Sequence, residues 1–396
     1  MLIRQLQPQD AEQAFRLRVA AFAGGAAAYD PDEIYLPDAH RLVAVDGGRV
    51  VGHLGVWPFR QAFLGHAVPM GGVGAVAVAA DRRGGGIGSR LLAAALDHMG
   101  SAGMAISTLY ASTPLPYRRW GWEYAGAHIR RRVATRDLLD LPAPRHAVDL
   151  RPHTPADLGA LADVQDALAL TEPGGLVSGE RWLARALQTD PDEATIAAVA
   201  TRGGSPVGLA LARKTATDHA DDHSSFGLEM LRLFGVDRDV ERALWRFVGH
   251  HHPVAATTLF RSRPAEPLLL ELPHGLHLRG LADEHFMTRL VDAPAAIAAR
   301  GWPGLSASVE LEVIDDRRPA NSGRFVLEID DRRGALSRGG AGRVAVDIGA
   351  LSSLYTGFVR ATDLARAGRL PGASGRDLTA LDDAFTAPAP FLRAYF

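Results

Sequence analysis

The residues of this chain that are best suited to chemistry by type and spacing lie in one glycine-rich loop. Arg83, Gly86 and Gly88 fit the spacing Arg/Gln-x-x-Gly-x-Gly/Ala, and they separate an apolar run at 73–79 from an amphipathic stretch. Glycines in such a turn let backbone N–H groups gather around an anion. The positive end of the following helix dipole points to the same place. The pattern predicts a cradle for a diphosphate, with Arg82 beside it.

The spacing excludes two other kinds of phosphate-binding loop. Gly-x-x-x-x-Gly-Lys-Ser/Thr is absent, so a nucleotide hydrolase would lack its lysine and its magnesium-binding hydroxyl. Gly-x-Gly-x-x-Gly is absent too, because Leu91 stands where the third glycine would be, and no acidic residue is placed to hold a ribose. The remaining alternative is an ordinary tight turn from a strand into a helix.

A second group of candidate residues follows the next apolar run. Residues 106–110 are typical of a strand, and a loop that contains prolines leads from it to Tyr117. A phenol near the end of the predicted strand at 73–79 could donate a proton to a leaving group such as a thiolate, because phenols and thiols have similar ordinary pKa values. The alternative is a packed tyrosine with a hydrogen-bonded hydroxyl.

Two further clusters are weaker candidates. His250, His251 and His252 are adjacent, so on a helix they would point in different directions, and a solvated helix end explains them better than a metal site. We therefore predict no metal. Four acidic residues could attract a cationic amine or could serve as turn and cap residues: Asp30, Asp32, Glu33 and Asp38.

The composition limits the class of protein. A chain of 396 residues with 47% hydrophobic and 22% charged residues is expected to form two or three globular domains. A formal net charge of −2 without a long basic run argues against a nucleic-acid partner. The absence of cysteine excludes disulfides, thiol catalysis and cysteine-bound metal. Without a signal peptide or an apolar run of about 20 residues, the chain is predicted to be cytoplasmic, with no membrane partner.

Three segments contain the elements that must position the candidate residues. We place the domain boundaries so that the segments are 1–147, 148–285 and 286–396. The first segment is expected to contain, in order, a helix, two antiparallel strands, a strand, a helix and a strand, at 11–23, 42–45, 50–56, 73–79, 88–99 and 106–110. The second repeats this order more weakly, at 155–170, 194–200, 206–213, 226–236 and 239–248. The third has strands at 309–314, 323–329 and 344–348, then short helices at 350–358, 363–367 and 378–385.

The second segment lacks the diphosphate cradle of the first. Its corresponding loop, 235–241, has no pair of spaced glycines and carries three carboxylates, Asp237, Asp239 and Glu241. Coulomb repulsion and missing backbone donors would disfavour a diphosphate there. We interpret the segment as a scaffold copy without a second active site.

Several motifs carry a resemblance to a known family. The glycine-rich pattern, with Val76 and Val78 upstream, resembles the acetyl-CoA-binding motif of the GNAT acetyltransferase superfamily. Residues 346–357 resemble part of the sterol-carrier-protein-like fold. The segment Tyr110-Ala111-Ser112-Thr113-Pro114-Leu115-Pro116-Tyr117-Arg118-Arg119-Trp120-Gly121-Trp122 resembles the Ser … Tyr-x-x-Phe-Gly-Tyr segment of the Eis (enhanced intracellular survival) family, with tryptophans at the two aromatic positions. The chain thus resembles the Eis family over essentially its whole length.

The resemblance implies a fold and a set of site residues. The fold is α/β (α+β), with two tandem GNAT-like domains, the second degenerate, followed by a sterol-carrier-protein-like α+β domain, and the assembly is a homohexamer. The catalytic residues implied are Tyr117 as the acid and the terminal carboxylate of Phe396 as the base. The residues implied to bind acetyl-CoA are Val76, Ala77, Val78, Arg83, Gly84, Gly86, Ile87, Gly88 and Ser112.

The expected reaction is acetyl transfer from acetyl-CoA to a primary amine by direct attack in a ternary complex. The acceptor would be an aminoglycoside, a polyamine or a lysine-like amine. Burial beside Phe391 and Tyr395 would raise the pKa of the terminal carboxyl, and Arg393 should face away from it, because a guanidinium would keep it ionised and weakly basic. Two alternatives remain: a different acyl donor on the same fold, or a CoA-sensing lipid-binding protein that uses the third domain.

Overall fold

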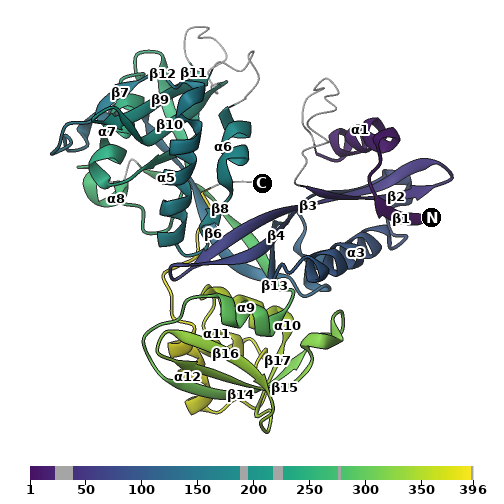
Figure 1. The fold of residues 1–396 in the computed structure, drawn as a ribbon. Helices are drawn as coiled ribbons and strands as arrows, with labels where there is room; N and C mark the ends of the chain where they lie inside the picture. Colours follow the sequence, from purple (N-terminus) through teal and green to yellow (C-terminus); the bar gives the residue numbers. More distant parts are fainter. Residues whose placement is uncertain (23–38, 188–194, 217–225, 275–277, 394–395) are drawn as a thin grey trace. The chain divides into compact units, whose positions relative to one another are not determined.

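The computed structural model describes the chain except for residues 23–38, 188–194, 217–225, 275–277 and 394–395 (Figure 1). Its contacts divide the chain into two compact units. The first unit contains residues 1–125, 285–388 and Phe396, and the second contains residues 126–284 and 389–395. The first and third sequence segments thus share one unit, and the C-terminal tail contributes to both units. The boundaries at 147/148 and 285/286 stay predictions.

The N-terminal part of the first unit is a twisted sheet with helices on both faces. Its strand order is β1-β2-β3-β4-β5, and the end of β13 lies antiparallel to β5. β4 and β5 are parallel, whereas β1 to β4 form antiparallel pairs. The elements are β1 (Leu2–Gln5), η1 (Pro8–Asp10), α1 (Ala11–Ala21), β2 (His40–Asp46), β3 (Arg49–Phe63), β4 (His66–Val78), η2 (Ala80–Arg82), α3 (Ile87–Ser101), β5 (Ile106–Tyr110) and α4 (Pro114–Arg118). Strands β6 (Glu123–Ala134) and β13 (Arg279–Leu290) contribute residues to both units.

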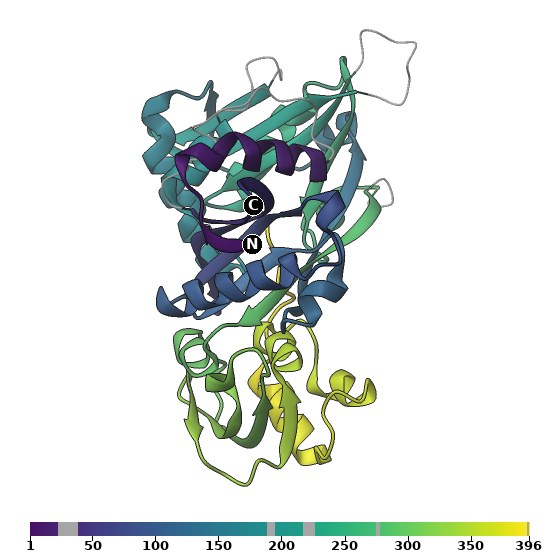
Figure 2. The ribbon, with the colours of Figure 1, turned by 90° about the vertical axis from the view of Figure 1, so that its right-hand side faces the viewer.

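Helices α1 and α3 cover opposite faces of this sheet because successive side chains of a strand alternate between its faces. Val43 of β2 packs with Phe15 of α1. Its neighbour Leu42 belongs to the core that contains Leu91 of α3. Figure 2 shows the two helices on either side of the strands.

The C-terminal part of the first unit is a four-stranded sheet in the order β16-β15-β14-β17, with β17 parallel to β14. Its helix α10 begins at a side-chain cap from Asp347 and ends at Gly357, whose φ is +78°, and all nine of its residues are buried. The elements are α9 (Ala293–Ala299), β14 (Ala307–Ile314), η6 (Pro319–Asn321), β15 (Gly323–Asp330), β16 (Arg333–Arg338), β17 (Val344–Asp347), α10 (Ile348–Thr356), α11 (Ala361–Arg366) and α12 (Gly375–Ala384).

The second unit repeats the order of elements of the N-terminal part of the first unit. Its strand order is β12-β11-β10-β9-β7, and β11 is parallel to β12. Leu161 of α5 packs on one face of the sheet and Leu244 of α7 on the other. The elements are η3 (Thr135–Asp140), β7 (Asp149–Arg151), η4 (Pro155–Asp157), α5 (Leu158–Thr171), β8 (Leu176–Val177), α6 (Gly179–Leu187), β9 (Thr195–Arg202), β10 (Ser205–Thr215), β11 (Phe226–Gly235), α7 (Arg238–Gly249), β12 (Ala255–Ser262) and α8 (Leu268–Glu271). The predicted element order of the second segment is confirmed.

The structure contains the predicted helices and strands and adds several that the sequence analysis missed. The hairpin of β3 and β4 extends well beyond the predicted strands. Pro58, a residue type that usually marks the end of a strand, pairs with Gly71 inside this hairpin. Strands β6, β12, β13 and β16 were not predicted.

Candidate functional site

The glycine-rich loop of the first unit has a conformation that only glycine adopts easily. It connects the end of β4 to the start of α3. Gly84 and Gly86 have φ angles of +79° and +75°, and a Cβ atom built on either one would meet no other atom within 4 Å. The backbone angle, and not crowding, therefore requires glycine at these two positions.

The first turn of α3 offers backbone N–H groups that have no partner within the helix. Gly86 is the N-cap residue and has no side chain, so it makes no capping bond. The N–H of Arg90 donates to the carbonyl of Gly86, which leaves the N–H groups of residues 87–89 to point out of the helix end. The N-terminus of this fifteen-residue helix has no side-chain cap, and a helix end of this kind can bind an anion.

The two arginines of the loop differ in their surroundings. The Nη1 atom of Arg82 lies 3.0 Å from a carboxylate oxygen of Asp46, so this guanidinium is held at the hairpin turn between β2 and β3. Arg83 is exposed, and its Nε lies 3.5 Å from the carbonyl oxygen of Val78. Of the two, Arg83 is the one that stays beside the end of β4.

Strands β4 and β5 separate next to this loop. Their parallel pairing runs from Met70 and Ile106 to Gly72 and Thr108 and goes no further. Residues 73–78 of β4 therefore have one edge that β5 does not cover, while Ala77 and Val78 still pair with β3 on the other edge. An open strand edge can bind an extended amide-containing chain by backbone hydrogen bonds.

A bulge in β4 lies at the point of separation. Ala75 has a φ of +51°, which is unusual for a residue with a side chain, and the register between β3 and β4 shifts there. Nδ1 of His53 lies 2.9 Å from the carbonyl oxygen of Ala75, so the neutral ring donates this hydrogen bond. Burial lowers the pKa of His53 to about 4, so the ring is neutral near pH 7 and supports the bulge.

Tyr117 lies on the short helix α4, which follows β5 directly. Its ring is half-buried against Trp122, with the ring centroids 6.4 Å apart. The backbone N–H groups of Trp120 and Trp122 both donate to the carbonyl of Tyr117, which ties the turn together. Ser112 is exposed in the loop between β5 and α4.

A buried ion pair that the sequence analysis missed supports the turn after Tyr117. Gly121 has a φ of +85°, and a Cβ atom there would lie 1.9 Å from Nη1 of Arg289. This guanidinium donates to the carbonyl of Trp120 at 2.6 Å and to both carboxylate oxygens of Asp315. An arginine between apolar residues at the end of a strand signals a buried partner, but the sequence does not tell which carboxylate it is.

The C-terminal residue Phe396 belongs to the first unit and lies where β4 and β5 separate. Its ring centroid is 5.3 Å from that of Phe59 and 5.8 Å from that of Tyr110. A Cβ atom built on Gly72 would come within 2.8 Å of this ring, and one built on Gly74 within 3.7 Å of the backbone oxygen of Phe396. The terminal carboxyl group therefore lies beside residues 72–74 of β4.

The residues just before Phe396 belong to the other unit. The N–H of Phe391 donates to the carbonyl of Pro173 within the second unit, so its place beside the terminal carboxyl group stays a prediction. The apolar surroundings that the first unit supplies to Phe396 are rings that are distant in sequence. Arg393 is bound by the carboxylate of Glu172 and by the carbonyl of Leu233, all within the second unit. Tyr395 lies outside the described residues.

The corresponding loop of the second unit is closed to an anion. Asp237 is the N-cap of α7, and its carboxylate accepts a hydrogen bond from the N–H of Val240 and two from Arg202. Asp239 and Glu241 have their own arginine partners on the same helix. The predicted carboxylates thus occupy the helix end that a diphosphate would need.

The remaining candidate residues are not brought into a site. His250 to His252 lie just after α7, where the ring of His251 bonds the carbonyl of Phe247. In the part of the chain that the structure describes, no group of three or more metal-ligating residue types could hold a metal ion. No described helix is both long and apolar enough to cross a membrane. The acidic residues Asp30, Asp32, Glu33 and Asp38 lie outside the described residues.

Three models of protein families match the chain and together cover most of it. Residues 2–125 and residues 174–290 each match a model described as an acetyltransferase (GNAT) domain. Residues 293–393 match a model described as a sterol carrier protein domain. The tandem arrangement and the C-terminal domain predicted from the sequence are thus confirmed.

The chain is similar to named proteins of the same kind. It is 31% identical over 331 residues to an uncharacterized N-acetyltransferase of Streptomyces coelicolor, which covers 81% of this chain and 79% of the relative. It is 29% identical over 376 residues to N-acetyltransferase Eis of Mycobacterium bovis, covering 88% and 86%. The crystal structure of a GCN5-related N-acetyltransferase from Kribbella flavida matches all of both chains with a TM-score of 0.85 and 28% identity. Eis1 from Mycobacterium abscessus shares the fold over all of both chains, with a TM-score of 0.81 and 24% identity.

Proposed function

Since the chain belongs to the Eis-like GNAT family of N-acetyltransferases and is an enzyme, we propose that it transfers an acetyl group from acetyl-CoA to a primary amine in the first unit. The acceptor class we propose is an aminoglycoside, a polyamine or a lysine-like amine. The observation that carries the proposal is the convergence of three features at one place: the open edge of β4, the uncapped start of α3 and the C-terminal residue Phe396.

The open edge and the uncapped helix would hold the two polar parts of acetyl-CoA. Backbone groups of Val76, Ala77 and Val78 would bond the amides of the pantetheine arm, and the first N–H groups of α3 would bind the diphosphate. Arg83 adds a positive charge from an exposed position. Gly84, Gly86 and Gly88 have no side chains and would leave room for the phosphates. Ile87 would supply one of the helix-end N–H groups, and Ser112 would contact CoA.

The proton balance of the transfer needs one base and one acid. The amine must lose a proton to become nucleophilic, and the terminal carboxylate of Phe396 would accept it. The amine nitrogen then forms a bond to the acetyl carbon while the bond from that carbon to sulfur breaks. Tyr117 would donate a proton to the thiolate that leaves. The nitrogen, which still carries one proton too many after the attack, would then release it to the tyrosinate, which gives the neutral amide and restores Tyr117. Since the chain has no cysteine, no enzyme thiol can carry the acetyl group, and no covalent enzyme intermediate is needed for direct attack by the amine.

A thiol-release assay with acetyl-CoA and a panel of amines tests the proposal. The panel would hold aminoglycosides, polyamines and lysine derivatives, and we expect release of CoA in proportion to acetylated amine. If acetyl-CoA binds but no amine gives turnover, the alternative of a CoA-sensing lipid-binding protein gains support. If free CoA is released from propionyl-CoA but not from acetyl-CoA, the alternative of a different acyl donor on the same fold would be favoured instead.

A substitution at Gly88 should weaken the binding of acetyl-CoA without disturbing the fold. A Cβ atom on Gly88 would meet only a methyl group of Val78 at 3.9 Å, so a side chain fits there. Gly88→Glu should weaken acetyl-CoA binding at least about tenfold, because two like charges 4 Å apart cost roughly 1 kcal/mol in water and more near a protein surface. Isothermal titration measures the affinity. Gly88→Ala is the matched control and should bind nearly normally, and equal affinity of the two variants would contradict the assignment of this loop.

The two loops predict one acetyl-CoA per chain. The start of α3 is uncapped, whereas the start of α7 is already occupied by the carboxylate of Asp237. Titration calorimetry should therefore give a stoichiometry near one per chain. A value near two would show that the second unit binds acetyl-CoA in spite of its capped helix.

The proposed homohexamer can be tested on the same samples by analytical ultracentrifugation.

A further inference from the structure

The second unit contains a cavity at the position where its own parallel strands separate. The pairing of β11 with β12 runs from Phe226 and Ala255 to Glu229 and Leu259 and then stops. The space beyond has a volume of about 80 Å³, which is room for several water molecules. Strand β11, helices α5 and α7, the segment after β12 and the C-terminal tail all line it.

One part of the cavity wall is apolar and aromatic. Trp245 of α7 and Phe260 of β12 pack edge to face, with ring centroids 5.0 Å apart, and both line the space. Leu168 of α5, Met230 of β11 and Phe391 of the tail add to this wall. The wall suits a hydrocarbon or aromatic group.

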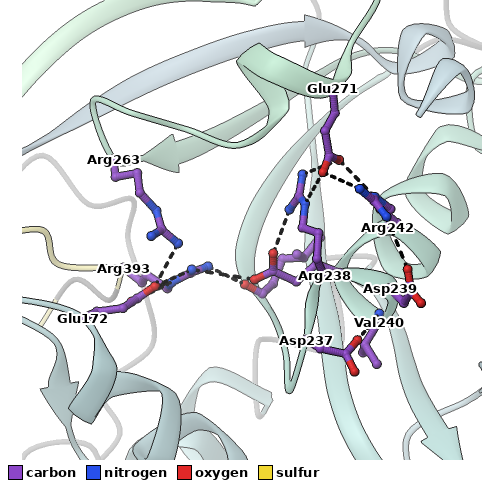
Figure 3. A network of polar contacts seen from close by, with 11 residues as sticks. Glu172, Asp237, Arg238, Asp239, Val240, Arg242, Arg263, Glu271 and Arg393 are labelled. Atoms are coloured by element: carbon purple, nitrogen blue, oxygen red, sulfur yellow. Dashed lines mark hydrogen bonds and ion pairs between the residues drawn. The ribbon is translucent and has the colours of Figure 1, made fainter. Parts of the chain in front are cut away.

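The other part of the wall carries charges, and three of its arginines already have carboxylate partners. Arg263 and Arg393 both bond Glu172, at 3.0 Å and 2.6 Å (Figure 3). Arg238 bonds Glu241 at 2.7 Å and Glu271 at 2.8 Å. These guanidinium groups are held by the protein's own carboxylates.

Glu266 is the exception among the acidic residues of the cavity. It lines the space from the segment that follows β12. Within the described residues its carboxyl group makes no hydrogen bond and no ion pair, and burial raises its pKa. Glu266 is only partly buried, so its carboxylate can be reached from the cavity, and a ligand that supplied a donor would give it a charge-assisted hydrogen bond.

We infer that this cavity binds a small organic amine, with the ammonium group on Glu266 and an apolar body against Trp245 and Phe260. The ammonium would form a charge-assisted hydrogen bond with the unpartnered carboxylate. The rings of Trp245 and Phe260 would cover the hydrocarbon part and remove it from water. The buried Nε of Arg263, which has no acceptor, would donate to a hydroxyl or carbonyl oxygen on the same ligand. Arg232 and Arg261 also line the cavity, so an anionic ligand is the competing possibility, and the comparison with 3-phenylpropanoate below decides between the two charges.

This binding site is separate from the proposed acetyl transfer. It lies within the second unit, whose helix end is capped, and it needs neither acetyl-CoA nor turnover. Because Phe391 and Arg393 line the cavity, an amine bound there would also hold this part of the C-terminal tail more firmly. Binding and catalysis can therefore be measured independently.

Calorimetry on the full-length protein without acetyl-CoA tests the inference, with 2-phenylethylamine as the probe. Glu266→Gln should weaken binding roughly 10- to 100-fold, the usual effect of losing a hydrogen bond to a charged group. Asp163→Asn is the matched control, since it makes the same change at an exposed carboxylate of α5 outside the cavity, and it should leave the affinity unchanged. Leu168→Trp should abolish binding by filling the space without changing any charge. Acetylation kinetics should be unchanged in Glu266→Gln.

Three results would overturn the inference. The first is equal affinity of the wild type and Glu266→Gln for 2-phenylethylamine. The second is equal or tighter binding of 3-phenylpropanoate, which has the same ring but the opposite charge. The third is a binding heat that persists in Glu266→Gln and disappears when an acceptor of the transferase reaction is added as a competitor, because the probe would then bind only at the catalytic site.

The pH dependence gives an additional readout of the same contact. The groups that face Glu266 are Arg393 of the tail, Arg263 of its own segment, and Arg238 and Glu241 of α7. Burial raises the pKa of Glu266, so its carboxylate becomes protonated at a higher pH than an ordinary glutamate. Affinity for 2-phenylethylamine should therefore fall as the pH drops through this raised pKa, and Glu266→Gln should lose that dependence.

Discussion

Adding a few residues after Phe396 should lower kcat about 10²- to 10⁴-fold, the usual contribution of a general base. The extension converts the terminal carboxylate into an amide, which cannot accept the proton of the amine. The ring of Phe396 can keep its contacts with Phe59 and Tyr110, so the loss would come from the carboxylate and not from the packing. Steady-state kinetics with saturating acetyl-CoA measure the effect.

Two control proteins make this result specific. The same residues added before Met1 should leave kcat unchanged. Phe396→Leu keeps the carboxylate but loses the aromatic contacts, so it should lose activity much less than the extended protein does. If the extended protein folds normally and retains full activity, the terminal carboxylate is not the base, and another acidic group or a bound water must take that role.

Tyr117→Phe should reduce kcat by roughly 10²- to 10⁴-fold, because the leaving thiolate would lose its proton donor. The substitution removes one oxygen atom and leaves the ring, so the contact with Trp122 and the turn that Arg289 supports should stay in place. The affinity for acetyl-CoA should change little. Rapid-quench or steady-state kinetics give kcat, and calorimetry gives the affinity.

Another tyrosine of the same unit serves as the control for Tyr117. Tyr124 packs near Arg118 and His285 and has no part in the proposed proton transfer. Tyr124→Phe should therefore keep near-normal turnover. A Tyr117→Phe enzyme with the activity of Tyr124→Phe would show that Tyr117 is a packed aromatic residue and not the acid.

Local sequence was sufficient to predict the glycine-rich turn before α3 and its difference from the corresponding loop before α7. A glycine at the start of α3 and an aspartate at the start of α7 decide which helix end stays open, and both effects act within a single turn. The element order was predictable for the same reason, because the period of the apolar residues reports on the local backbone. The long hairpin of β3 and β4 was not, since tertiary pairing held Pro58 in a strand that its intrinsic preference would end.

The contacts that build the sites were decided only by the tertiary structure. The sequence by itself showed that Phe396 stands in an apolar, aromatic segment, but Phe59 and Tyr110 reach it only through the arrangement of β3, β4 and β5. In the same way, the buried Arg289 needed a buried carboxylate as its partner, but the sequence contains many carboxylates that could form this ion pair with it, and the structure selects Asp315. A buried charge requires a partner, and only the packing of distant segments selects which residue it is.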